Sequence, residues 1–226
     1  MSKNSGKNSN YKNNVGVKAV EETKPQLSKD QIKNIIIWGT TALIILGIIV
    51  AAIILSIPKT TYVEMDFGEY GKVVVKLDDE EAPITVKNFV NLVNEGFYDG
   101  LTIFRAQKNF VIQGGKDDSV DLTPIKGEFD ENGVANNISH LRGVISMART
   151  SEPDSATSQF FITLADSAAY SLDGKYAGFG HVVEGMEVVD AIAEKLMSCD
   201  ADYMGFVSDD DAITIVSIKV IDYKEK

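Results

Sequence analysis

One short segment of the chain, YDGLTIFRAQKNFVIQGG at positions 98–115, contains an arginine, a phenylalanine and a glutamine whose spacing suggests a shared site. Two apolar runs flank a short loop in this segment, a pattern typical of a β-hairpin. The hairpin would place Arg105, Phe110 and Gln113 on neighbouring strands. Because a guanidinium is always charged and donates hydrogen bonds, an arginine beside apolar rings is suited to electrostatic stabilisation in a water-poor pocket.

Each of these residues has an ordinary interpretation when it is considered alone. An arginine such as Arg105 usually pairs with a surface carboxylate, and rings such as Phe110 and Phe161 usually belong to the core. The joint spacing favours a functional site instead. The sequence has no G-x-S-x-G motif and no Gly-rich loop ending in Lys-Ser or Lys-Thr. One cysteine, Cys199, and two histidines make a His/Cys metal site improbable, so we expect no metal and no cofactor.

Two further segments extend the pattern beyond the hairpin. GVISMA (143–148) leads to SQFFITL (158–164), and SLDGKYAGFGHVVEGMEVVDAI follows at 171–192. With the hairpin and in this order, they resemble the cyclophilin family of prolyl isomerases over about residues 61–223. The resemblance implies a mainly β fold: a closed, antiparallel, eight-stranded cyclophilin-like β-barrel capped by two helices.

The resemblance also implies roles for individual residues. Arg105 matches the catalytic arginine, and Phe110 and Gln113 complete the catalytic set. Gln113 matches a glutamine that hydrogen-bonds near the substrate and the arginine. The implied substrate-binding residues include two walls of the proline pocket, two contacts to the peptide backbone and a histidine at the pocket rim; the full set is Val111, Ala148, Arg149, Phe161, Leu172, Tyr176 and His140.

The chemistry of an X–Pro bond agrees with these residue types. Rotation about the bond crosses a barrier of about 18–20 kcal/mol because resonance makes C–N partly double. No bond is broken, so a catalyst needs only to favour the twisted amide, whose prolyl nitrogen accepts a hydrogen bond. An acceleration of about 10⁵ requires about 7 kcal/mol, and one charge-assisted hydrogen bond contributes about 1.5–3 kcal/mol. Arg105 is therefore insufficient alone, and an apolar pocket must supply the rest.

The sequence departs from the family pattern at several positions. Phe104 stands where the family usually has His, and strand alternation predicts that it points away from Arg105 and fills the barrel. Arg149 replaces the usual Asn, and Val111 the usual Met. Ser171 stands where many members have Trp, which predicts cyclosporin binding with reduced affinity. Tyr176 replaces a His of many eukaryotic members and is frequent in bacterial relatives.

The elements that must position these residues are mostly short strands. One helix is predicted from Pro83 until Gly96 ends it, and a second spans Met186–Leu196. The last strand changes the phase of its alternation near residues 215–216, which suggests a bulge. The predicted strands cover residues 73–77, 101–105, 110–113, 143–148, 159–164, 177–183 and 212–223.

The N-terminal part has a different character. Residues 1–34 contain seven Lys and three acidic residues, and their composition predicts a disordered basic tail in the cytoplasm. Residues 35–57 have no charge and predict one transmembrane helix. This run is longer than a signal-peptide core, which favours an uncleaved anchor. The lysines before it predict, by the positive-inside rule, that residues 58–226 form an extracytoplasmic isomerase domain at the cell membrane.

Charge and the site motifs leave two hypotheses about function. The net charge of −11 excludes nucleic acid as a partner, because residues 1–34 carry +4 and the remainder therefore carries −15. The first hypothesis is a prolyl isomerase that acts on proline-containing polypeptides during folding of secreted or surface proteins. The alternative is a membrane-tethered proline-peptide-binding module with weak or no isomerase activity. An acidic insertion at 198–211 has no predicted role.

Overall fold

The computed structural model describes residues 27–56 and 60–225. The chain divides into two compact units, Met1–Ile57 and Pro58–Lys226, which we describe separately. Most of the predicted basic tail, residues 1–26, lies outside the described residues, and so does the predicted end of the transmembrane helix at residue 57.

The first unit contains helix α1 (Lys29–Ser56). It begins six residues before the predicted span, so residues 29–34, predicted to be disordered, are helical. A reciprocal cap explains this start: the Gln31 N–H donates to Ser28 Oγ at 3.2 Å, and the Ser28 N–H donates to Gln31 Oε1 at 2.9 Å. Its Lys29–Val50 stretch is long and apolar enough to cross a membrane by length and composition.

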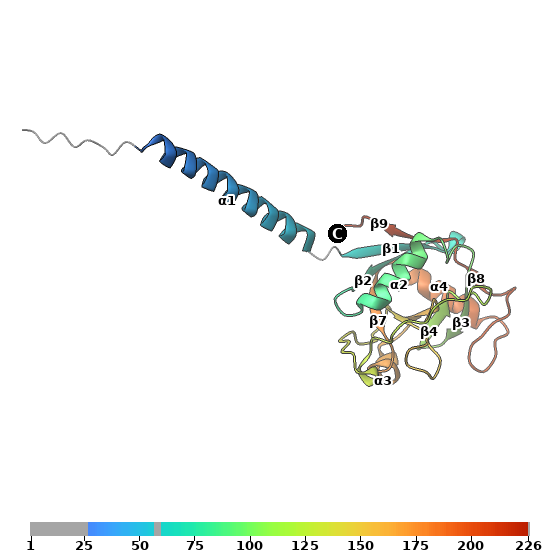
Figure 1. The fold of residues 1–226 in the computed structure, drawn as a ribbon. Helices are drawn as coiled ribbons and strands as arrows, with labels where there is room; N and C mark the ends of the chain where they lie inside the picture. Colours follow the sequence, from blue (N-terminus) through green and yellow to red (C-terminus); the bar gives the residue numbers. More distant parts are fainter. Residues whose placement is uncertain (1–26, 57–59, 226) are drawn as a thin grey trace, which may run out of the picture. The chain divides into compact units, whose positions relative to one another are not determined.

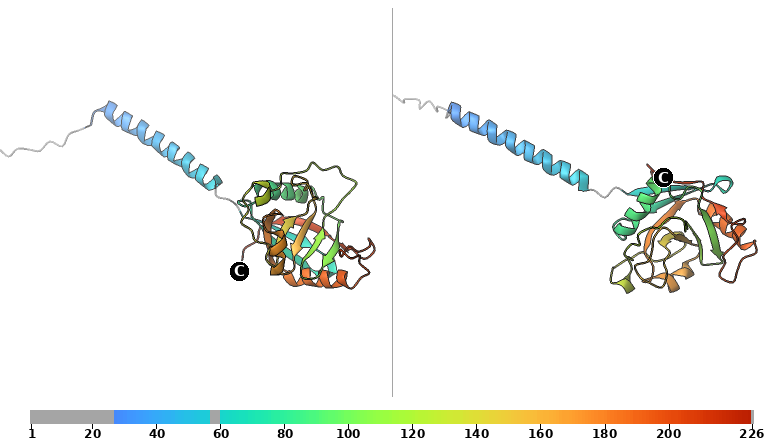
Figure 2. Two further views of the ribbon diagram at one scale, coloured as in Figure 1. Left: turned by 90° about the horizontal axis from the view of Figure 1, so that it is seen from below. Right: turned by 45° about the vertical axis from the view of Figure 1, so that its right-hand side comes forward.

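Within residues 60–225, nine strands form one curled antiparallel sheet with the order β8-β3-β4-β6-β5-β7-β2-β1-β9 (Figures 1 and 2). Every predicted strand has a counterpart, and β1, which sequence analysis did not single out, pairs with β2 and β9. The strands are β1 (Thr61–Asp66), β2 (Lys72–Leu77), β3 (Thr102–Gln107), β4 (Val111–Gly114), β5 (Val144–Met147), β6 (Phe160–Thr163), β7 (Gly178–Glu184), β8 (Ile213–Thr214) and β9 (Ser217–Ile221).

The sheet differs from the predicted closed barrel of eight strands because the last predicted strand divides in two. Ile215 and Val216 leave the ladder, close to the predicted bulge, and separate β8 from β9. β8 pairs with β3, whereas β9 pairs with β1 at the other end of the strand order. The Ile215 N–H donates to Leu101 O and the Val216 N–H to Asp66 O, so two consecutive residues step from one edge of the curled sheet to the other.

Two 12-residue helices, α2 (Pro83–Asn94) and α4 (Met186–Met197), lie at opposite ends of the curled sheet (Figure 2), and both pack into the same main core. Both predicted helices are confirmed. Phe89 on α2 packs into an aromatic cluster with Tyr98, Phe160 and Phe179, with ring centroids 5.1–5.9 Å apart. The shorter elements are α3 (Ala169–Leu172) and the 3₁₀ turns η1 (Gly68–Tyr70), η2 (Asp130–Asn132) and η3 (Asp166–Ala168).

A buried carboxylate holds the start of α2. Glu128 is 2% exposed, and its side chain accepts hydrogen bonds from the Ile84 N–H, the Thr85 N–H and the Thr85 hydroxyl at 2.7–3.0 Å. Ala82, at the N-cap position, offers no side-chain cap. Glu128 therefore satisfies free N–H groups of the first turn from 43–44 residues away and places a negative charge at the positive end of the helix.

Candidate active site

Three predicted catalytic and pocket residues form a row across neighbouring strands. Arg105 on β3 pairs with Gln113 on β4, and Gln113 pairs with Phe161 on β6. Cross-strand partners share one face of a sheet, so the three side chains lie side by side. Their neighbours Ile112 and Ile162 point to the opposite face and are at most 1% exposed in the core. The alternation of each strand thus gives one face to the core and the other to the site.

The half-buried Arg105 guanidinium is held in place by three hydrogen bonds. Nη1 donates to Gln113 Oε1 at 2.8 Å, Nη2 donates to Gln107 Oε1 at 3.2 Å, and Nε donates to the Met204 carbonyl at 2.9 Å. Gln113 is oriented in turn, because its Nε2 donates to Gln159 Oε1 at 3.1 Å. Contacts among the described residues use three of the five guanidinium N–H groups, which leaves two for a ligand.

A pocket of about 230 Å³ opens beside this guanidinium. Its apolar wall is a small cluster, separate from the main core, built around Val111, Phe161 and Leu172. Burial lowers the pKa of Arg105, partly offset by the nearby Asp202 carboxylate, and the group stays charged at neutral pH. Nine predicted site residues line the pocket together with Phe206: Arg105, Phe110, Val111, Gln113, Ala148, Arg149, Phe161, Leu172 and Tyr176.

Arg149 belongs to the pocket wall as a fixed side chain. Its Nε and Nη2 donate to the Lys175 carbonyl at 3.0 and 2.8 Å. Its guanidinium carbon lies 4.8 Å from the ring centroid of Phe129 and 4.7 Å from that of Tyr176. Because its guanidinium lies over both rings, Arg149 packs against Tyr176, which also lines the pocket.

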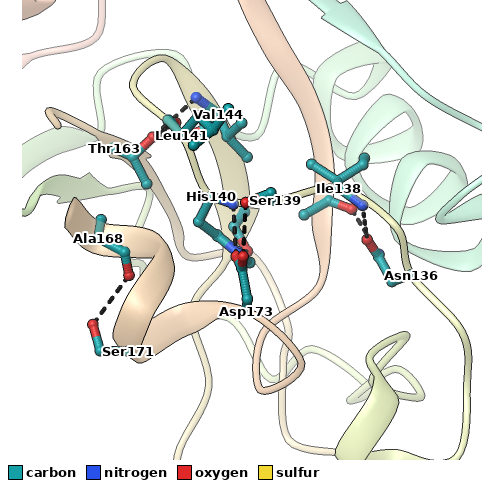
Figure 3. Close-up of polar contacts among 12 residues, drawn as sticks. Asn136, Ile138, Ser139, His140, Leu141, Val144, Thr163, Ala168, Ser171 and Asp173 are labelled. Carbon is teal, nitrogen blue, oxygen red and sulfur yellow. Dashed lines mark hydrogen bonds and ion pairs between the residues drawn. The ribbon is translucent and has the colours of Figure 1, made fainter. Parts of the chain in front are cut away.

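His140 does not lie at the pocket rim, contrary to the prediction. It is 1% exposed and sits behind Phe161, with ring centroids 6.0 Å apart. Its Nδ1 lies 2.8 Å from Asp173 Oδ1 (Figure 3), and its Nε2 lies 3.0 Å from Ser146 Oγ. Asp173 can only accept when ionised, which assigns the proton to Nδ1. Burial lowers the pKa of His140, so the ring is neutral at pH 7.

Two aromatic residues near the pocket differ from the prediction: Phe104 does not fill the interior, and Phe206 was not predicted to line the pocket. The register shifts between Ile103 and Arg105, a bulge that turns Phe104 away from the barrel interior. Phe104 instead stacks on Phe206, with centroids 6.0 Å apart and planes 10° apart. Phe206 lies in the acidic insertion and lines the pocket. The available signal was the apolar pair Phe206-Val207 inside an otherwise acidic stretch.

Comparison with known proteins agrees with this geometry. Residues 62–220 match the family model for cyclophilin type peptidyl-prolyl cis-trans isomerases. The chain belongs to this family. It is 50% identical over 132 residues to peptidyl-prolyl cis-trans isomerase A of Dickeya dadantii, covering 55% of this chain and 67% of that one. It is 39% identical over 129 residues to peptidyl-prolyl cis-trans isomerase B of Escherichia coli, covering 54% and 79%.

A solved structure shows the same fold. The cyclophilin type isomerase of Cryptosporidium parvum superposes with a TM-score of 0.61 at 24% identity, covering 74% of this chain and all of that chain. The cyclophilin is therefore a peptidyl-prolyl cis–trans isomerase with a curled antiparallel sheet, and members of its family bind proline-containing peptides. The predicted activity is confirmed. Of the predicted closed barrel of eight strands, only the coarser feature is confirmed, a cyclophilin-like curled antiparallel sheet with helices.

Proposed function

We propose that the Arg105 pocket is the isomerase active site and that it acts on X–Pro bonds of polypeptides outside the cytoplasm. One observation carries the proposal: Gln113 fixes the guanidinium of Arg105 beside an apolar pocket, and contacts within residues 27–56 and 60–225 leave two of its N–H groups for a ligand. The pocket volume of about 230 Å³ accommodates a prolyl ring with its flanking backbone.

In this mechanism the pocket favours the twisted amide over the planar one. Phe110, Phe161 and Leu172 hold the prolyl ring by apolar contact. As the C–N bond rotates, the prolyl nitrogen regains its lone pair, and a free N–H group of Arg105 donates to it. The planar amide is more charge-separated and is disfavoured in apolar surroundings. Because Gln113 orients the guanidinium before substrate arrives, little reorganisation is needed at the transition state.

The remaining pocket residues set the range of substrates. Val111 is a small side chain that leaves room beside the prolyl ring, while Ala148 and Arg149 lie where the peptide backbone passes. Ser171, on α3, donates its hydroxyl to the Ala168 carbonyl at 3.1 Å (Figure 3) and presents little apolar surface. This small polar side chain supports the proposal of reduced cyclosporin affinity.

Helix α1 supports the proposed location at a membrane. We propose that it is an uncleaved anchor, with the N-terminal tail in the cytoplasm and residues 58–226 outside. Seven lysines precede the apolar run, and only Lys59 lies close after it. The clients would then be proteins that fold after leaving the cytoplasm.

Catalysed exchange of an X–Pro peptide tests the active site. The full chain in detergent micelles should accelerate cis–trans exchange measured by NMR, and Arg105→Ala should lose about 100-fold or more, as when a single transition-state donor is removed. Arg105→Ala with undiminished exchange would contradict the role of Arg105. Peptide binding by the wild type without faster exchange would favour the tethered binding module.

Protease treatment of intact cells tests the topology. An impermeant protease added outside should degrade residues 60–225 while the N-terminal tail stays protected. The mass of the protein in the membrane fraction should equal that of the full chain. A shorter mature protein would identify a cleaved leader, and full protection of the domain would place it in the cytoplasm.

A further inference from the structure

The turn that contains Phe206 extends the sheet along the outer edge of β3. The Ala106 N–H donates to the Gly205 carbonyl at 3.0 Å, and the Val207 N–H donates to the Phe104 carbonyl at 3.0 Å. These two bonds flank a bridge between Arg105 and Phe206. In an antiparallel ladder such a flanked pair is the close one, with Cα atoms about 4.5 Å apart, so the two side chains must contact each other.

The Phe206 ring contacts two consecutive residues of β3. Phe104 stacks on it, and the Arg105 guanidinium carbon lies 5.0 Å from its centroid. The same turn supplies the Met204 carbonyl that accepts from Arg105 Nε. Arg105 is therefore oriented from two sides, by Gln113 on β4 and by this turn.

Hydrogen bonds within the turn at residues 202–207 stabilise its conformation. The Asp202 carboxylate accepts hydrogen bonds from the Met204 and Phe206 N–H groups at 2.8 and 2.9 Å. Gly205 has φ +85°, and a Cβ at this position would run into the Ala106 carbonyl. A glycine is thus required both for the left-handed backbone and for the close approach to β3.

We propose that Phe206, presented by the turn at residues 202–207, is a positioning residue for Arg105. Its ring and the Met204 carbonyl restrict a long, flexible side chain to the orientation in which the remaining N–H groups face the pocket. Preorganised groups contribute more to catalysis than groups that must be ordered during the reaction. The proposal rests on the proposed catalytic role of Arg105 and assigns a function to the acidic insertion.

A double-mutant cycle tests this role with the full chain in detergent micelles. Phe206→Ala should lower kcat/KM for X–Pro exchange about five- to tenfold, the factor expected for a partly desolvated cation–π contact. The peptide Kd, measured by NMR titration, should change less than twofold. In the Arg105→Ala background, Phe206→Ala should cause no further loss, because contacting residues that act as one unit are not additive.

Three further variants separate the effect of the Phe206 ring from that of the turn that presents it. Phe206→Tyr keeps the ring and should restore wild-type exchange. Gly205→Ala displaces the turn without altering the ring, so it should reproduce the loss even where Phe206→Ala unfolds the protein. Tyr203→Ala is the matched control: it removes a ring from the same turn that is 92% exposed and does not line the pocket, and it should leave exchange unchanged.

The outcomes that overturn the proposal are distinct from failure of the active-site assignment. An equal loss from Phe206→Ala in both backgrounds would make Phe206 a direct substrate contact. A loss that appears entirely in the peptide Kd would make it a binding wall, and no loss at all would remove its role. Undiminished exchange in Arg105→Ala would instead refute the proposed function, and the positioning role with it.

Discussion

The two faces of strand β6 differ in what they do for the protein. Phe160 and Ile162 are completely buried and pack in the main core with α2, whereas Phe161 points to the small cluster beside the pocket. The main core contains most of the buried apolar surface, which dominates folding stability. The small cluster borders a pocket and stays partly open. Neighbouring residues on one strand therefore face the main core on one side and the proposed active site on the other.

The largest difference between the two faces of β6 is expected when Phe160 and Phe161 are each replaced by alanine. Phe160→Ala should lower the free energy of unfolding by about 3–5 kcal/mol, since it leaves a cavity in a closely packed core. Phe161→Ala should lower X–Pro exchange strongly and stability less, because part of its cavity opens to solvent. Urea unfolding and NMR exchange measure both quantities. Equal losses of stability in both variants would show that the two faces are not separate.

Glu128, whose carboxylate caps the start of α2, gives a second prediction about stability. Glu128→Gln should lower the free energy of unfolding by about 2–3 kcal/mol, because the amide turns an N–H₂ group toward buried donors and leaves them unsatisfied. Exchange activity per folded molecule should not change. Glu131→Gln, at an exposed position on η2, is the matched control and should alter the stability little. A loss of activity without a loss of stability would contradict the assignment.

His140 lies between Phe161, which faces the pocket, and Ser146 on β5. It predicts that the free energy of unfolding depends on pH. Its folded-state pKa is lowered by burial from 6.5, so below pH 6.5 the unfolded state binds the extra proton first. The stability contributed by neutral His140 is therefore present above pH 6.5 and is lost as the pH falls, by at most about 1.4 kcal/mol per pH unit. His140→Gln should remove this slope between pH 7 and pH 5 in thermal unfolding. An unchanged slope would assign it to other groups.

The smallest effect is expected at the pocket wall. Arg149→Asn removes the stacking on Phe129 and Tyr176 and should weaken peptide binding about three- to fivefold, in line with about 1 kcal/mol for a cation–π contact. The exchange rate at saturating enzyme should stay close to wild type. Titration and exchange spectroscopy separate the two. A larger loss in rate than in affinity would place Arg149 in the transition-state contacts.

Local patterns were sufficient for much of the fold and site. The apolar spacing of α2 and α4 and the hairpin of β3 and β4 predicted elements that the structure contains. At the phase change near residue 215 the structure has a break between β8 and β9 in place of the predicted bulge. Helix α1 begins six residues before the predicted span, because Ser28 and Gln31 cap it there. The position of Phe104 was wrong because alternation assumes a regular ladder, and a bulge breaks that ladder.

The sequence by itself determined the family, the isomerase chemistry and most residues around the pocket, because these depend on residue types at fixed spacings within strands. Only the tertiary structure decided what surrounds Arg105 from distant parts of the chain. Met204 and Phe206 contact Arg105 although they lie about 100 residues later in the chain. His140 lies behind Phe161, where its ring reaches a buried hydrogen-bond partner, Ser146. Such contacts arise because the loop between α4 and β8 packs along β3 and the segment before β5 packs against β6, and no local period encodes them.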